Sequence, residues 1–144
     1  MTDESLKSIG KLKELKVATL DHCPFTDAGL AELITCQKLE QISFWGATIT
    51  DEGIAHLAKI KSLKELNLRE SQITDAGLEH VSHLENLTKI ILQDTRVSDV
   101  GLMKLAKCKK LKTVWLYHTP VTEKGMRELR ALLPDCDVAK VPIE

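Results

Sequence analysis

Aromatic side chains are scarce in this sequence, and features of several common protein classes are missing. Aromatic residues make up only 3% of the 144 residues, so a core must be built from Leu, Ile, Val and Ala. No apolar run approaches the roughly 18–20 residues that a membrane helix needs. The four cysteines show neither a CxxC pair nor a zinc-ligand spacing, which favours free thiols in a reducing compartment.

A charge excess of one sign is also missing. The net charge of -1 supplies no overall field that would hold nucleic acid or an anionic membrane, and we expect neither as a partner. The first residues, Met1 to Ser5, are acidic and polar, the reverse of a secretory signal peptide. We therefore expect a cytoplasmic protein, and we also expect a monomer without a cofactor.

What the sequence does contain is an internal repeat of 24 residues without insertions. The first position of each copy is a leucine, and we number the positions of each repeat from it: Leu15, Leu39, Leu63, Leu87 and Leu111. Positions four, six and eleven are apolar in nearly every copy. Position twelve is Thr or Ser, position thirteen is Asp or Glu, and position fifteen is always Gly, as in Thr74, Asp75 and Gly77.

Each copy combines two periodicities. Positions one, four and six predict a short strand, and positions sixteen, nineteen and twenty-two, such as Leu78, Val81 and Leu84, follow the i, i+3 spacing of a helix. The Thr or Ser before them is a good helix N-cap, and the acid after it suits the positive end of the helix dipole. Because one strand and one helix cannot bury an apolar edge alone, we expect the copies to stack.

The pattern LxxLxLxx(S/T/C)xITDxGLxxLxxL resembles leucine-rich repeats of the cysteine-containing and bacterial ITDxGL types, which are similar to those in the substrate-reading arms of F-box proteins. The resemblance covers nearly the whole chain and implies an α/β fold. This fold is a right-handed leucine-rich-repeat solenoid with a parallel sheet on the concave face and helices on the convex face. The sequence contains no F-box segment, so no ubiquitin-ligase role is implied.

We expect one domain over residues 1–144, composed of three parts. Residues 1–14 are predicted to form an N-terminal half-repeat helix, residues 15–134 five repeats, and residues 135–144 a C-terminal capping strand. Lys140 and Pro142 on that strand are typical protection for an open sheet edge. Two interpretations stay open: a complete small protein capped at both ends, or the terminal segment of a longer array.

The candidate functional surface is the concave sheet face. Positions three, five, seven and eight should point onto it, and they hold both tryptophans and the only tyrosine, whereas Phe25 and Phe44 fall in core positions. Trp, Tyr and Arg are enriched in interface hot spots, and charged neighbours set partner choice and on-rate. We therefore predict a protein partner bound by Trp45, Arg69, Ile91, Trp115 and Tyr117, with His22, Glu70, Asp94 and His118 beside them. Ile91, Trp115, Tyr117 and Val141 are expected to form an apolar patch.

Two other interpretations compete with partner binding. In the first, the rings only cover the sheet, and the segment is a spacer or cap in a longer array. In the second, Glu70, Asp94 and His118 lie ~5 Å apart on successive strands and hold a metal or perform acid–base chemistry. An open face offers no pocket that excludes water, and solvated ion pairs with Arg69 or Arg96 are the simpler interpretation. We therefore expect a non-catalytic protein without a metal.

Two further groups of residues complete the expectations. Cys36 and Cys108 occupy position twenty-two, which elsewhere holds Ile60, Leu84 and Leu132, so all are predicted to face the core. A lysine cluster is expected on the convex side and in the loop that follows it, where it either contacts an acidic surface or is solvated. Its members are Lys104, Lys107, Lys109, Lys110 and Lys112.

Overall fold

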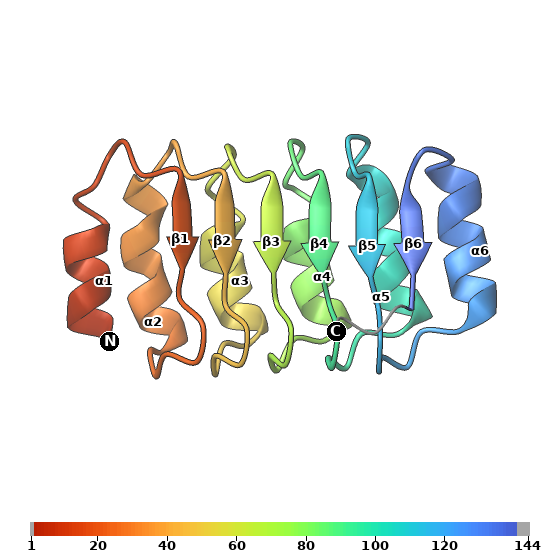
Figure 1. The fold of residues 1–144 in the computed structure, drawn as a ribbon, viewed down its shortest axis with the longest axis horizontal. Helices are drawn as coiled ribbons and strands as arrows, with labels where there is room; N and C mark the ends of the chain where they lie inside the picture. The colour runs from red at the N-terminus through yellow and green to blue at the C-terminus, as the bar shows by residue number, and fades with distance from the viewer. Residues whose placement is uncertain (1, 141–144) are drawn as a thin grey trace.

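The computed structural model describes residues 2–140, in which short strands and helices alternate along the chain (Figure 1). The elements are α1 (Asp3–Ile9), β1 (Val17–Thr19), α2 (Asp27–Leu30), β2 (Gln41–Ser43), α3 (Asp51–Leu57), β3 (Glu65–Asn67), α4 (Asp75–Val81), β4 (Lys89–Ile91), α5 (Asp99–Lys104), β5 (Thr113–Trp115), α6 (Glu123–Leu132) and β6 (Asp137–Ala139). Short 3₁₀ segments, Ala31–Thr35 and Leu105–Lys107, continue α2 and α5.

The six strands form one parallel sheet in the order β1-β2-β3-β4-β5-β6. Every connection crosses through a helix, and all helices cover the same face of the sheet, so the chain advances as a solenoid (Figure 1). The predicted α/β solenoid is confirmed. None of the helices within residues 2–140 combines the length and apolarity that crossing a bilayer requires.

Strand pairing follows the sequence repeat residue for residue. Ile42 pairs with Leu66, Leu66 with Ile90, and Ile90 with Val114, an offset of one repeat each time. Because the offset never changes, side chains at one repeat position stack in a straight row across the sheet. The surface of the sheet is therefore a set of such rows, each with its own chemistry.

The core lies between the sheet and the helices. Leu66, Leu68 and Ile73, at positions four, six and eleven of one repeat, are all at most 1% exposed. Phe25 and Phe44 are also buried, and their rings meet edge to face with centroids 6.2 Å apart. Their predicted core location is confirmed.

The burial of position twenty-two departs from the prediction at the C-terminal end of the stack. Ile60 and Leu84 lie in the turn after their helices, α3 and α4, and both are fully buried. Leu132 occupies the same position but is 53% exposed, so its predicted core location is wrong. The reason is that α6 continues unbroken through this position, and the following Leu133 is buried instead.

A ladder of hydrogen bonds that sequence reasoning missed ties each repeat to the next. The carboxylate of Asp51 accepts the backbone N–H of Thr74 at 2.9 Å and its hydroxyl at 2.6 Å. The same two bonds recur in every repeat, and we call the five carboxylates the aspartate ladder: Asp3, Asp27, Asp51, Asp75 and Asp99, bonded to Thr26, Thr50, Thr74, Ser98 and Thr122. Hydrogen bonds to the ionised form stabilise it, and those from Thr122 hold the pKa of Asp99 below its ordinary value.

The ladder explains the glycine at position fifteen of each repeat. A Cβ on Gly77 would overlap the carboxylate of Asp51 in the preceding repeat. The carboxylate can reach the next Thr only because the helix offers a bare Cα at this point. The recurring Thr-Asp-x-Gly therefore serves the contact between repeats as well as the capping of each helix, for which the hydroxyls of Thr50, Thr74 and Thr122 are used.

The four cysteines are free thiols that differ in burial. Cys36 and Cys108 are 0% exposed, as position twenty-two predicted, and burial raises the pKa of Cys108 to about 11. Burial likewise raises the pKa of Cys136 to about 11, whereas Cys23 is partly exposed.

We expect only Cys23 to react readily with Ellman's reagent in the native protein at mildly alkaline pH, because attack requires an accessible thiolate. Mapping the labelled peptides by mass spectrometry, with and without urea, checks this expectation. Rapid native labelling of Cys108 would instead show that the stack opens at that repeat.

Candidate functional site

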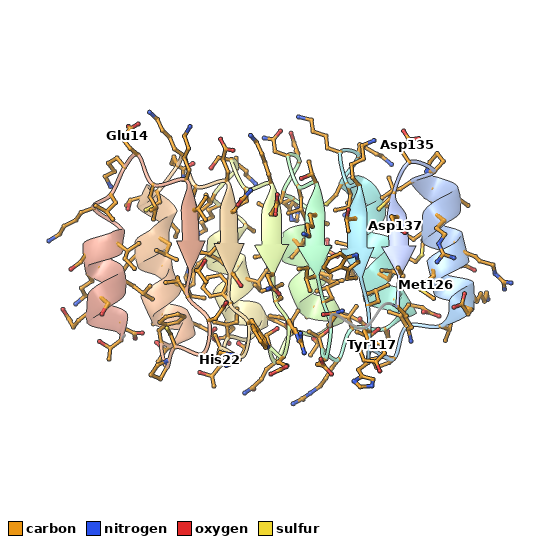
Figure 2. All side chains as sticks on the ribbon, in the orientation of Figure 1. Glu14, His22, Tyr117, Met126, Asp135 and Asp137 are labelled. Atoms are coloured by element: carbon orange, nitrogen blue, oxygen red, sulfur yellow. The ribbon has the colours of Figure 1, made fainter. Side chains whose placement is uncertain are left out.

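Position eight, just beyond each strand, has an unusual backbone conformation. His22, Glu70, Asp94 and His118 have φ between 52° and 57°, and Gly46 has φ 66°. Residues other than glycine rarely adopt this left-handed conformation, which costs roughly 1–2 kcal/mol. The only sequence signal was the glycine in this row. The turn places the residues of positions seven and eight along the edge of the sheet that the C-terminal ends of the strands form (Figure 2).

Four predicted site residues at the first strands of this edge are in mutual contact. The His22 and Trp45 rings have centroids 4.9 Å apart, and the Arg69 guanidinium lies 4.8 Å from the centroid of Trp45. Arg69 also places its Nε 3.3 Å from Oε1 of Glu70. The guanidinium thus makes a cation–π contact and an ion pair at once, and its side chain is only 24% exposed.

The contacts continue through the later strands. Asp94 stands between two cations: its Oδ2 lies 3.7 Å from Nε of Arg69, and its Oδ1 lies 3.0 Å from Nδ1 of His118. The His118 ring stacks on Tyr117 with centroids 3.9 Å apart. Together these contacts link the ends of β1 to β5 into one set, which we call the edge row: His22, Trp45, Arg69, Glu70, Asp94, Tyr117 and His118. Figure 2 labels His22 and Tyr117 at this edge.

The edge row has the geometry of an ion-pair network. Arg69 occupies the space between Glu70 and Asp94, as the solvated-ion-pair interpretation expected. Within residues 2–140, no group of three or more His, Cys, Asp or Glu side chains is arranged to hold a metal ion. The edge row presents charged groups and ring faces on the surface of the protein.

Two of the predicted site residues lie outside the edge row, at position five in the middle of the sheet. Ile91 pairs with Asn67 and Trp115 on the flanking strands and is only 9% exposed, so it offers less surface than the sequence suggested. Trp115 is half-buried and carries the Lys89 ammonium 4.7 Å above its ring. Val141, expected to join the same apolar patch, lies outside the described residues.

A hollow of about 200 Å³ lies on the sheet face over β1 to β4. Sequence reasoning did not identify it, although the small residues Thr19, Ser43 and Asn67 at position five were a signal. The Asn67 amide donates a hydrogen bond of 3.1 Å to the hydroxyl of Ser43. Val17, 54% exposed, and Ile91 also line this hollow, which therefore offers both polar and apolar contacts.

Comparisons with known proteins agree with this architecture. Residues 59–82 and 83–106 each match the family model described as Leucine Rich repeat. A leucine-rich-repeat protein of Leptospira interrogans is similar in structure, with a TM-score of 0.71 and 22% identity over 92% of this chain and 33% of that one. An internalin of Listeria monocytogenes gives a TM-score of 0.55 and 16% identity over 96% of this chain and 51% of that one.

The chain thus spans about a third and about half the length of these two structural neighbours. A search of curated proteins found no match to the sequence. The family model matches two consecutive central repeats, and the sheet, the helices and the repeat register extend the same architecture along the described residues. The described residues therefore have the fold of a leucine-rich-repeat solenoid.

Proposed function

We propose that this chain is a non-catalytic module that binds a protein partner on its sheet face, along the edge row and the adjoining hollow. The observation that carries the proposal is the edge row itself. Aromatic rings, a guanidinium and carboxylates from neighbouring repeats form one connected surface in a protein that has very few aromatic residues. Leucine-rich-repeat folds are typically protein-interaction modules, which supports this proposal.

The arrangement suits tight recognition because its parts are held before a partner arrives. Trp45 is fixed between the His22 ring and the Arg69 guanidinium, so little side-chain entropy remains to be lost on binding. Trp and Arg are the residue types that most often dominate binding energy. Glu70 and Asp94 then contribute to partner choice and association rate through their charge.

The proposal is tested by affinity capture from a lysate of the source organism. The native chain is compared with a Trp45→Ala, Trp115→Ala, Tyr117→Ala variant, and a matched control carries Val100→Ala and Lys107→Ala on the helix side, where both residues are exposed. We expect the control to retain the captured partner. The sheet-face variant should lose it, because hot-spot truncations cost at least about 2 kcal/mol, or roughly thirtyfold in affinity.

Thermal melts of all three proteins separate binding from folding. Loss of capture with an unchanged melt supports the sheet face as the binding surface. Retained capture by the sheet-face variant overturns the proposal, because the partner then binds elsewhere. Absence of any partner for the native chain favours the alternative of a structural spacer or cap in a longer array.

A further inference from the structure

Positive charge gathers where the strands begin, at the edge of the sheet opposite the edge row. The net charge of the whole chain is only -1. More than half of the 20 lysine and arginine residues lie in or beside the loops that run from each helix to the next strand. We call these residues the lysine edge: Lys11, Lys13, Lys16, Lys38, Lys59, Lys61, Lys64, Lys107, Lys109, Lys110 and Lys112, all of them exposed. Glu14 and Asp135, labelled in Figure 2, mark the two ends of this edge.

Helix electrostatics account for part of this segregation. All the helices run in the same direction, so their negative C-terminal ends meet at the lysine edge and favour cations there. Four of the lysines are also paired with carboxylates of a neighbouring repeat: Lys38 with Glu14, Lys64 with Glu40, Lys107 with Glu79 and Lys112 with Asp135. These effects explain why lysine is frequent along the whole lysine edge. They do not explain why a hollow lies at one point of it.

That hollow lies between the Lys109–Lys112 loop and the end of α6 and has a volume of about 150 Å³. Leu111, Leu132, Leu133 and Pro134 supply its apolar lining, and Lys109, Lys112 and Asp135 supply charged lining groups. Leu132 is 53% exposed, which leaves a large aliphatic surface uncovered beside two ammonium groups. We call this site the Leu132 hollow.

The two ammonium groups of the hollow are available to a ligand. Among residues 2–140 no carboxylate pairs with Lys109. Lys112 Nζ lies 3.6 Å from Asp135 Oδ2, between side chains that are 59% and 86% exposed. An ion pair so exposed contributes little to stability, so Lys112 can readily exchange Asp135 for another carboxylate.

We propose that the Leu132 hollow binds an acidic peptide segment of a partner protein that carries one large apolar side chain. The apolar side chain covers Leu132 and Leu133, and carboxylates on either side of it pair with Lys109 and Lys112. This site is separate from the edge row, which lies at the opposite edge of the sheet. The inference therefore holds whether or not the sheet face binds a partner.

The observations favour a peptide over other anionic partners. Single-stranded nucleic acid is usually held by aromatic rings on which its bases stack, and the helix-to-strand loops contain no Phe, Tyr or Trp. Glu14, Glu40, Glu85 and Asp135 interrupt the lysine edge, which weakens it as a continuous track for a polyanion or a membrane surface. The combination of aliphatic lining and two flanking cations matches an apolar residue between acids.

The test uses a short fluorescein-labelled peptide of Asp and Glu residues with one central Leu, and anisotropy measures its binding to the whole chain. Leu132→Ser and Lys109→Gln/Lys112→Gln are the hollow variants. Leu12→Ser and Lys13→Gln/Lys16→Gln are matched controls, because they occupy the same repeat positions at the other end of the stack and Leu12 is equally exposed, at 53%. All the substituted side chains are exposed, so melting temperatures should not change.

We expect each hollow variant to weaken peptide binding about tenfold and each control to change it less than about twofold, a tenfold change being about 1.4 kcal/mol. Replacing the central Leu of the peptide by Ala should weaken binding to the native chain and have little further effect on Leu132→Ser. The proposal is overturned if the native chain does not bind the peptide, or if hollow and control variants lose affinity equally. It is also overturned if an oligo-dT strand or phosphatidylserine vesicles bind more tightly than the peptide.

Discussion

A Gly125→Ala variant is expected to unfold at a lower urea concentration than the native protein, with a loss of about 1–3 kcal/mol in the free energy of unfolding. A Cβ at this position would overlap the carboxylate of Asp99, which accepts the N–H and the hydroxyl of Thr122 at 2.8 and 2.6 Å. Either the aspartate ladder breaks or α6 moves away from α5. Urea unfolding followed by circular dichroism measures the effect.

In an Asp99→Ala background, Gly125→Ala should no longer lower the free energy of unfolding. With the carboxylate removed, its overlap with the new methyl group disappears, and the Cβ of residue 99 stays 3.1 Å away. Alanine also has a higher helix propensity than glycine by about 1 kcal/mol, so Gly125→Ala should then be neutral or stabilising. Simple addition of the two single losses in the double variant would contradict direct packing of glycine against the ladder.

Leu84→Ala is expected to lower the free energy of unfolding by about 2–5 kcal/mol, because it leaves a cavity in a packed core. Leu132→Ala should cost less than about 0.5 kcal/mol, the usual range for a surface substitution. The two leucines occupy the same repeat position, but Leu84 is 0% and Leu132 is 53% exposed. Urea unfolding of the two variants compares them directly.

Equal losses for the two leucine variants would contradict the structure at α6. They would mean that Leu132 packs in solution as its repeat position predicts, and that no exposed leucine lines the hollow at the lysine edge. A small loss for Leu132→Ala would show that the fold tolerates truncation of this side chain, and a melt of Leu132→Ser makes the same check for the variant used in the peptide-binding experiment.

Much of the fold could be predicted from the repeat. A fixed period without insertions allows only one register, so Leu66 had to pair with Ile42 and Ile90 once the strands were placed. Positions four, six and eleven were then buried in all five repeats, as Phe44 and Leu68 show. The candidate surface could also be anticipated in outline, since position alone brings Trp45 and Arg69 to one side of the sheet.

The aspartate ladder could not be inferred from local patterns because its bonds join different repeats. Beside Thr74 in the sequence, Asp75 reads as an acid at a helix N-terminus, whereas in space its carboxylate bonds to Ser98. The recurring glycine was visible in the sequence, but its reason was not. Only stacking brings the carboxylate of one repeat against the bare Cα of the next.

The sequence by itself determined the period, the strand register and the rows of side chains, because each of these depends only on where a position recurs. The tertiary structure alone decided how much of each side chain stays exposed and what it contacts. Ile91 is nearly covered by its neighbours, Arg69 lies over Trp45, and Leu132 faces solvent because α6 does not end where earlier helices do. Exposure depends on the neighbouring repeats and the exact end of each helix, which a repeat pattern does not specify.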